Sequence, residues 1–69
     1  MSISIIITNM KDERNKILAR NIKAERYRKG VTQTELAEKI DVSESTISLI
    51  ERGVQTPSIF LVYDISRFL

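Results

Sequence analysis

The side chains best suited to binding a ligand lie in one short stretch, residues 43 to 52. Glu44 offers a carboxylate that accepts hydrogen bonds, and Ser45 and Ser48 offer hydroxyls that donate or accept them. Leu49 adds an apolar contact. On a helix these four side chains share one exposed side, because residues three or four apart are neighbours on its surface. Their chemistry is recognition of a polar partner.

Composition argues against catalysis. The 69-residue chain has no cysteine and no histidine, which removes disulfides, thiolate zinc sites and the commonest metal ligand and general base. The nine acidic side chains have the spacing of solvated helix faces and caps, and no glycine-rich phosphate loop accompanies them. We therefore expect a protein that is not an enzyme, with no cofactor, no metal and no evident small-molecule ligand.

Length allows one small domain, whose core is marginal enough that a partner subunit often contributes to stability. The longest apolar run, residues 5 to 7 with their neighbours, is too short to span a bilayer. No basic segment precedes it, as a signal peptide would require. We expect a cytoplasmic protein with no membrane partner.

A capped helix is predicted at residues 33–40. Thr32 and Glu35 fit a capping box, in which each side chain accepts a hydrogen bond from the backbone amide of the other residue. Asp41 follows where the chain must turn, and its short polar side chain tolerates left-handed backbone better than most residues. The helix is therefore expected to end there.

A second helix is predicted at residues 44–52. Ser43 is a good N-cap for it, Ile47 and Ile50 face inward, and Gly53 supplies the C-terminal stop. Two capped helices joined by a turn of three or four residues are typical of a helix-turn-helix, a unit that enters a DNA groove.

This pattern resembles the helix-turn-helix of the phage repressor and Cro family, also called the Cro/C1-type or XRE-type domain. The resemblance covers roughly residues 17 to 69 and rests on Thr32-Gln33, Leu36-Ala37, Val42-Ser43, Ile47-Ser48, Ile50-Glu51, Gly53 and Pro57-Ser58. A match at so many positions is far more specific than one short motif. It implies an all-α, lambda-repressor-like fold. It also implies a regulator, by default a repressor, that binds double-stranded DNA as a homodimer at a roughly palindromic operator.

The resemblance assigns the base-facing positions to Glu44, Ser45 and Leu49, and Ser48 is added because it lies on the same exposed side of the helix. Glu44 would accept from a cytosine amino group, Ser45 would bond to several base edges, and Leu49 would contact a thymine methyl. Two alternatives stay open. Glu44 would also suit a first-turn acid favoured by the helix dipole, and Leu49 would suit burial.

Backbone and structural roles follow from the same resemblance. Gln33 matches the residue that anchors the DNA backbone, and Arg52 and Gln55 resemble further phosphate contacts. Arg26 with Glu51 resembles the family's structural ion pair. The family most often has Gly where this chain has Asp41, so this turn is expected to be slightly strained or differently closed.

Charge is unevenly distributed along the chain. The formal net charge is +2, but residues 11–29 hold eight basic and three acidic side chains, whereas residues 32–52 hold two basic and five acidic ones. We expect phosphate attraction to come mainly from the basic helix and Arg52, although simple solvation of that helix is the alternative. The acidic helix-turn-helix also supports a rival function: a protein-interaction module that dimerises with or sequesters another regulator, or an antitoxin-type autoregulator.

Four helices are expected, at residues 11–29, 33–40, 44–52 and 57–69. The last would be capped by Thr56 with Pro57 at its first position. Residues of the first helix expected near the core are Ile17, Leu18, Ile22 and Tyr27.

The helix expected at residues 57–69 is apolar on almost every side, and we expect no fifth helix of the kind that the family uses as a cover. Residues 11–69 would form the DNA-binding domain and residues 1–10 a strand or arm that pairs with a second copy or lies along the last helix. A frayed tail and a truncated longer regulator remain alternatives. The expected dimer interface comprises Ile3, Ile5, Ile7, Phe60, Leu61, Phe68 and Leu69.

Overall fold

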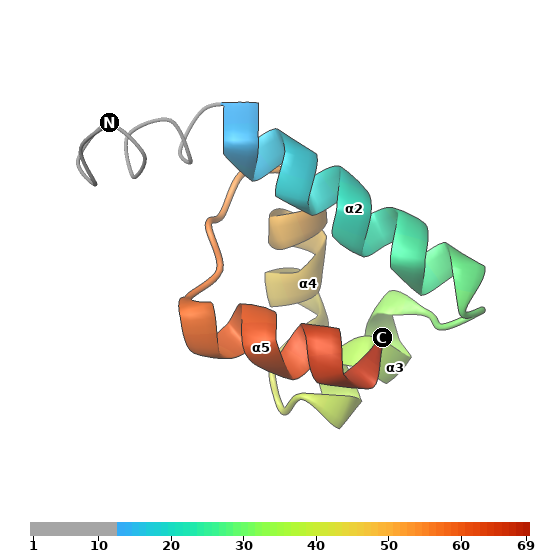
Figure 1. The fold of residues 1–69 in the computed structure, drawn as a ribbon. Helices are drawn as coiled ribbons and strands as arrows, with labels where there is room; N and C mark the ends of the chain where they lie inside the picture. The colour runs from blue at the N-terminus through green and yellow to red at the C-terminus, as the bar shows by residue number, and fades with distance from the viewer. Residues whose placement is uncertain (1–12) are drawn as a thin grey trace.

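The computed structural model describes residues 13–69 and shows four helices and no strand within them (Figure 1). They are α2 (Asn15–Arg28), α3 (Gln33–Lys39), α4 (Glu44–Glu51) and α5 (Ile59–Phe68). The all-α fold predicted from the sequence is therefore confirmed for this part of the chain. The strand or arm expected at residues 1–10 lies outside the described residues.

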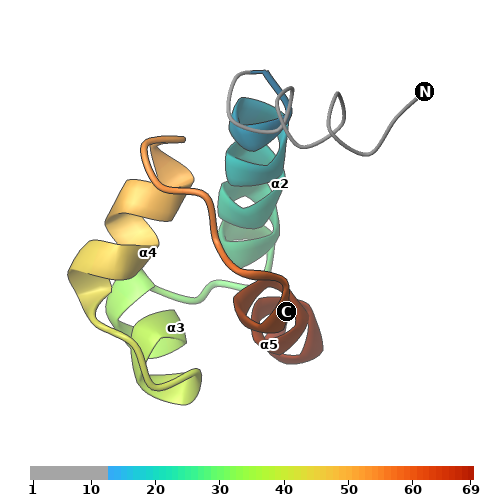
Figure 2. The same ribbon diagram turned by 90° about the vertical axis from the view of Figure 1, so that its left-hand side faces the viewer.

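The helices form two groups (Figure 2). Helices α3 and α4 pack closely on each other, α2 packs on α4, and α5 packs on α3. Seen along α5, the α3–α4 pair lies on one side of the molecule, and α2 and α5 lie on the other (Figure 2). One side of the helix-turn-helix therefore faces away from the two supporting helices.

Local capping explains where α3 begins. The Glu35 amide donates to the Thr32 hydroxyl at 3.0 Å, and the Thr32 amide donates to Glu35 Oε1 at 3.1 Å. This is the predicted capping box. Helix α3 ends before Asp41, whose φ of +58° is left-handed. The turn that usually contains glycine is thus closed here by an aspartate in the same backbone region.

Helix α4 has the N-cap that the sequence predicts. The Ser43 hydroxyl accepts from the Thr46 amide at 3.1 Å. The helix ends at Glu51, and Gly53 follows with a φ of +74°. A side chain at that position would both strain the backbone and contact Lys16 of α2.

The start of α5 corrects a prediction. Thr56 was expected as the cap, with Pro57 as the first helical residue. Instead, Ser58 is the N-cap and accepts from the Leu61 amide at 3.1 Å, so the helix begins at Ile59. Pro57 is buried before the helix. Ser58 caps the helix in place of Thr56, and Pro57 then lies before the helix, where it packs against the domain. Helix α5 therefore begins two residues later than predicted.

Two clusters of buried side chains make up the core. One contains Ile22, Ile50 and Ile65, and the other contains Leu36, Ala37 and Ile47. Ile40 and Leu69 pack against both clusters and join them. The inward orientation predicted for Ile47 and Ile50 is confirmed, since their relative exposures are 0% and 1%.

The outer face of α2 also differs from the prediction. Ile17 is 53% exposed and Tyr27 is 66% exposed, so the expectation that they face the core is wrong. The buried positions of α2 are Asn15, Ala19, Ile22 and Arg26, a row spaced by three or four residues. Ile17 and Tyr27 fall outside that row. The α-helical part begins at Asn15 and is preceded by helical residues 13 and 14, and the predicted start at Lys11 lies outside the described residues.

Candidate functional site

Helices α2 and α4 are joined by a buried ion pair. Arg26 Nε donates to Glu51 Oε2 at 2.7 Å, and Arg26 Nη2 donates to Glu51 Oε1 at 2.9 Å. The side chains are only 7% and 2% exposed. Arg26 Nη1 also donates to the Val31 carbonyl at 2.9 Å. The hydrogen bonds to Glu51 raise the pKa of Arg26 against the opposing effect of burial, so the guanidinium stays charged.

Gln33 extends this network to α3. Its side-chain amide donates to Glu51 Oε1 at 3.2 Å, and the residue is half-buried at the first position of the helix. The Glu51 carboxylate therefore links three helices. Gln33 is the residue that the resemblance assigns to DNA backbone contact. The Glu51 carboxylate therefore orients its side chain.

Five of the predicted DNA-contact residues line one surface hollow on α3 and α4: Gln33, Glu44, Ser45, Ser48 and Arg52. Leu49 is half-buried and lies outside this set. Gln55 is exposed in the segment after α4, where its backbone N–H donates to the Leu49 carbonyl at 3.2 Å. The structure thus brings residues expected to contact DNA bases and residues expected to contact the DNA backbone into one small area.

Glu44 has a partner that the sequence analysis missed. Thr34 Oγ1 donates to Glu44 Oε2 at 2.8 Å. Thr34 follows Gln33 in the first turn of α3. Its position next to a predicted DNA-contact residue was the one feature of the sequence that pointed to a role in the site. Its pairing with α4 depends on how the two helices cross.

Asn15 was also missed. It is 3% exposed, and its side-chain amide donates to the Gly53 carbonyl at 2.9 Å. A buried asparagine needs such partners. The bond ties the start of α2 to the turn that follows Arg52. Its signal in the sequence was its place four residues before Ala19, at the head of the buried row of α2.

The residues expected at a dimer interface fall into two groups on α5. Phe60 is 79% exposed, as is its neighbour Ile59, and Tyr63 is 60% exposed. Leu61, Phe68 and Leu69 are half-buried and pack against the core clusters. Ile3, Ile5 and Ile7 lie outside the described residues. The fully presented apolar surface of α5 is therefore Ile59, Phe60 and Tyr63, which we call the α5 stripe.

A separate apolar groove runs between α2 and α5. Its main apolar lining comes from Leu18, Ile22, Val62, Ile65 and Leu69. It shares no residue with the hollow on α3 and α4.

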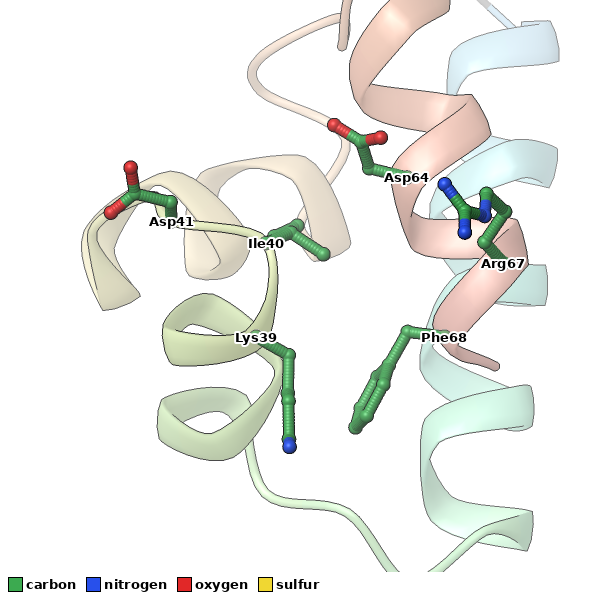
Figure 3. Close-up of a pocket in the computed structure, with 6 residues that line it drawn as sticks. All are labelled: Lys39, Ile40, Asp41, Asp64, Arg67 and Phe68. Carbon is green, nitrogen blue, oxygen red and sulfur yellow. The ribbon is translucent and has the colours of Figure 1, made fainter.

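Another pocket lies between the C-terminal ends of α3 and α5 (Figure 3). The Lys39 side chain and the Phe68 ring lie side by side there, with Lys39 Nζ 5.9 Å from the ring centroid, while the Asp41 carboxylate points away (Figure 3). Lys39 therefore covers part of Phe68, which limits the apolar surface that Phe68 presents.

Within residues 13–69, no group of three or more Asp, Glu, His or Cys side chains is placed to hold a metal ion. None of the described helices combines the length and the hydropathy needed to cross a membrane.

Comparison with known proteins agrees with this geometry. The family model HTH_3, described as helix-turn-helix, matches residues 22–69. The chain is 42% identical over 48 residues to an uncharacterised HTH-type transcriptional regulator of Methanothermobacter thermautotrophicus, covering 70% of each chain. It is 45% identical over 42 residues to another from Archaeoglobus fulgidus, covering 61% of this chain and 60% of that protein. No solved structure gives a significant match.

Proposed function

The chain belongs to the helix-turn-helix family of DNA-binding transcriptional regulators, and from that premise we propose that it binds a specific, roughly palindromic operator as a homodimer and represses transcription. One observation carries the proposal. The hollow on α3 and α4 gathers a carboxylate, an amide, hydroxyls and a guanidinium from five of the residues expected to contact DNA.

In this proposal α4 enters the major groove, which is wide enough for a helix. Glu44, Ser45 and Ser48 meet base edges, and the exposed part of Leu49 contacts a thymine methyl. Base contacts supply sequence preference, since contacts to phosphates carry none directly.

Phosphate contacts hold α4 in register. Gln33 stands at the N-terminus of α3, where the side-chain N–H that it does not give to Glu51 can donate to a phosphate. Arg52 and Gln55 are exposed beyond the C-terminal end of α4, the end to which Gln33 is hydrogen-bonded through Glu51. Phosphate contacts from these three residues would fix the position of α4 along the groove.

Dimer formation brings two copies of α4 to successive major grooves, about 34 Å apart. The α5 stripe supports this part of the proposal, because contiguous exposed apolar surface favours burial against another subunit. We propose that the stripe acts together with Ile3, Ile5 and Ile7.

The test is selection from a random-sequence duplex library, followed by mobility shift on the selected duplexes. A DNA-binding regulator retrieves a consensus with two related half-sites. Recovery of no consensus would contradict the proposal. That result would favour the rival, a module that dimerises with or sequesters another regulator, which the acidic charge of residues 32–52 supports.

Repression needs a separate test, because DNA binding alone does not determine whether transcription falls or rises. A reporter promoter that overlaps the selected operator is expected to lose expression when the protein is present. Increased expression would indicate an activator. An adjacent toxin gene would instead identify an antitoxin-type autoregulator, which also binds DNA.

A further inference from the structure

We infer that Thr34 is a positioning residue that orients Glu44 to read one cytosine in each half-site. The inference rests on the proposed function and names a sequence preference for the same site. It starts from the 2.8 Å hydrogen bond between Thr34 Oγ1 and Glu44 Oε2, which joins the first turns of α3 and α4.

Two adjacent residues of α3 hold the two ends of α4. Gln33 bonds to Glu51, and Thr34 bonds to Glu44. The two glutamates are seven positions apart, which corresponds to about 10 Å along a helix. The first turn of α3 therefore determines how α4 is presented and, at Glu44, how a side chain on it is aimed.

Capping does not account for the Glu44 carboxylate. The Ser43 hydroxyl already accepts from the Thr46 amide, and the side-chain hydrogen bond of Glu44 among residues 13–69 is the one from Thr34. That bond occupies Oε2. Oε1 accepts no hydrogen bond from any described residue, and Glu44 takes part in neither ion pair of the described chain. Glu44 thus presents at the edge of the hollow an oriented carboxylate whose Oε1 is free of donors from the described residues.

An ionised carboxylate accepts hydrogen bonds and cannot donate them. In the major groove cytosine presents the N4 amino donor, whereas guanine presents two acceptors and thymine presents an acceptor beside its methyl group. Adenine has an amino donor, but its N7 acceptor lies next to it and would repel the carboxylate. An oriented Glu44 therefore favours cytosine and rejects the other bases through unpaired acceptors.

Loss of the Thr34 hydroxyl frees the Glu44 side chain to rotate into solvent. The carboxylate then neither meets the cytosine amino group reliably nor opposes the other bases. The expected signature is relaxed preference at one base pair of each half-site, with the preferences at all other positions unchanged.

The experiment compares dissociation constants of the full chain for the duplex selected by the wild type and for duplexes changed at each position in turn. Thr34→Val, which replaces the hydroxyl with a methyl group, is expected to lower discrimination for cytosine about tenfold at one position. Thr34→Ser keeps the hydroxyl and is expected to keep the discrimination. Glu44→Gln is expected to move the preference towards adenine, which pairs well with an amide.

Two further comparisons separate positioning from a merely structural role. In a Glu44→Ala background, Thr34→Val is expected to have no effect on base preference, because the side chain that it positions is absent. Urea midpoints of every variant report folding separately. Thr34→Ala, which also removes the hydroxyl and has a high helix propensity, is expected to give the same relaxed preference and keeps the test valid if Thr34→Val unfolds.

The outcomes distinguish this inference from the proposed function. If the wild type selects no consensus, the proposed function itself fails. If the wild type selects a consensus but Thr34→Val weakens all duplexes equally or changes no preference, Thr34 is not a positioning residue. A consensus whose Glu44-dependent position is not cytosine would also overturn the inference.

Discussion

The guanidinium of Arg26 holds both carboxylate oxygens of Glu51, one from Nε at 2.7 Å and the other from Nη2 at 2.9 Å. Gln33 donates to the same carboxylate at 3.2 Å. Glu51 thus fixes α4 against both α2 and α3. Because the pair is almost fully buried, each partner depends on the other for its solvation.

We expect Arg26→Ala and Glu51→Ala each to lower the free energy of unfolding by about 3–5 kcal/mol, since each leaves a buried charge unpaired. Arg26→Ala combined with Glu51→Leu should recover part of the loss, because no unpaired charge remains. Urea denaturation of Arg26→Ala, Glu51→Leu and the double variant that combines them measures the coupling. Additive losses would show that the two side chains do not stabilise the fold as a pair.

The matched control is the exposed pair Glu25–Arg28 on α2. Its hydrogen bond from Arg28 lowers the pKa of Glu25. Any stability from this pair is therefore present above the ordinary carboxyl pKa and is lost as the pH falls through the lowered value. Because water screens both groups, we expect Glu25→Gln to leave the urea midpoint at neutral pH nearly unchanged. A loss as large as that of Glu51→Ala would contradict the role assigned to burial.

Asp41 provides a test of backbone strain in the turn between α3 and α4. Its φ of +58° disfavours residues with a Cβ, although aspartate tolerates it better than most. We expect Asp41→Ala to lower the free energy of unfolding by roughly 1 kcal/mol, whereas Asp41→Gly leaves it equal or higher. Urea denaturation checks both. A less stable Asp41→Gly variant would mean that the carboxylate contributes more than its backbone conformation costs.

Arg52 is predicted to contact a phosphate. We expect Arg52→Ala to weaken binding to all duplex sequences alike and to reduce the slope of log affinity against log salt by about 0.9. Mobility shift at several salt concentrations measures this slope. The control is Arg67→Ala, which removes the same charge from α5, outside the hollow that Arg52 lines, and should leave the slope nearly unchanged. A changed base preference with an intact salt slope would make Arg52 a base reader.

Self-association is expected to depend on the α5 stripe. Phe60→Asp places a charge on surface that is 79% exposed in the isolated chain, so it should weaken the dimer without unfolding the subunit. Phe68→Asp should also weaken it, but Phe68 packs against the core and its substitution costs stability as well. Deletion of residues 1–8 should weaken the dimer further. Sedimentation measures each effect, and operator affinity should fall without a change in base preference.

Ile17→Asp is the control for this prediction, since it adds the same charge at a 53% exposed isoleucine on α2. It should leave the sedimentation behaviour unchanged. A well-behaved wild-type monomer at high micromolar concentration would contradict the dimer.

The sequence by itself determined the helix-turn-helix, because the interactions that define it are local. Thr32 caps through Glu35, three residues away, Ser43 caps through Thr46 in the same way, and Asp41 closes the turn through its own backbone. Such signals depend on residue type and short spacing, so they can be read without knowing how the helices pack.

The resemblance anticipated the Arg26–Glu51 pair, but only the tertiary structure decided which other side chains from distant segments meet. Thr34 and Glu44 are ten residues apart and Asn15 and Gly53 are 38 apart, and both hydrogen bonds depend on how the helices cross. The start of α5 was likewise settled by packing, because two caps compete locally and Pro57 is buried when Ser58 is used. The side of α2 that faces the core was predicted only in part: Ile22 is buried as expected, but Asn15 and Arg26 are buried with it, whereas Ile17 and Tyr27 are exposed. Hydrophobicity alone would bury Ile17 and Tyr27 and expose Asn15 and Arg26. The hydrogen bonds from Asn15 to Gly53 and from Arg26 to Glu51 explain why the two polar residues are buried instead.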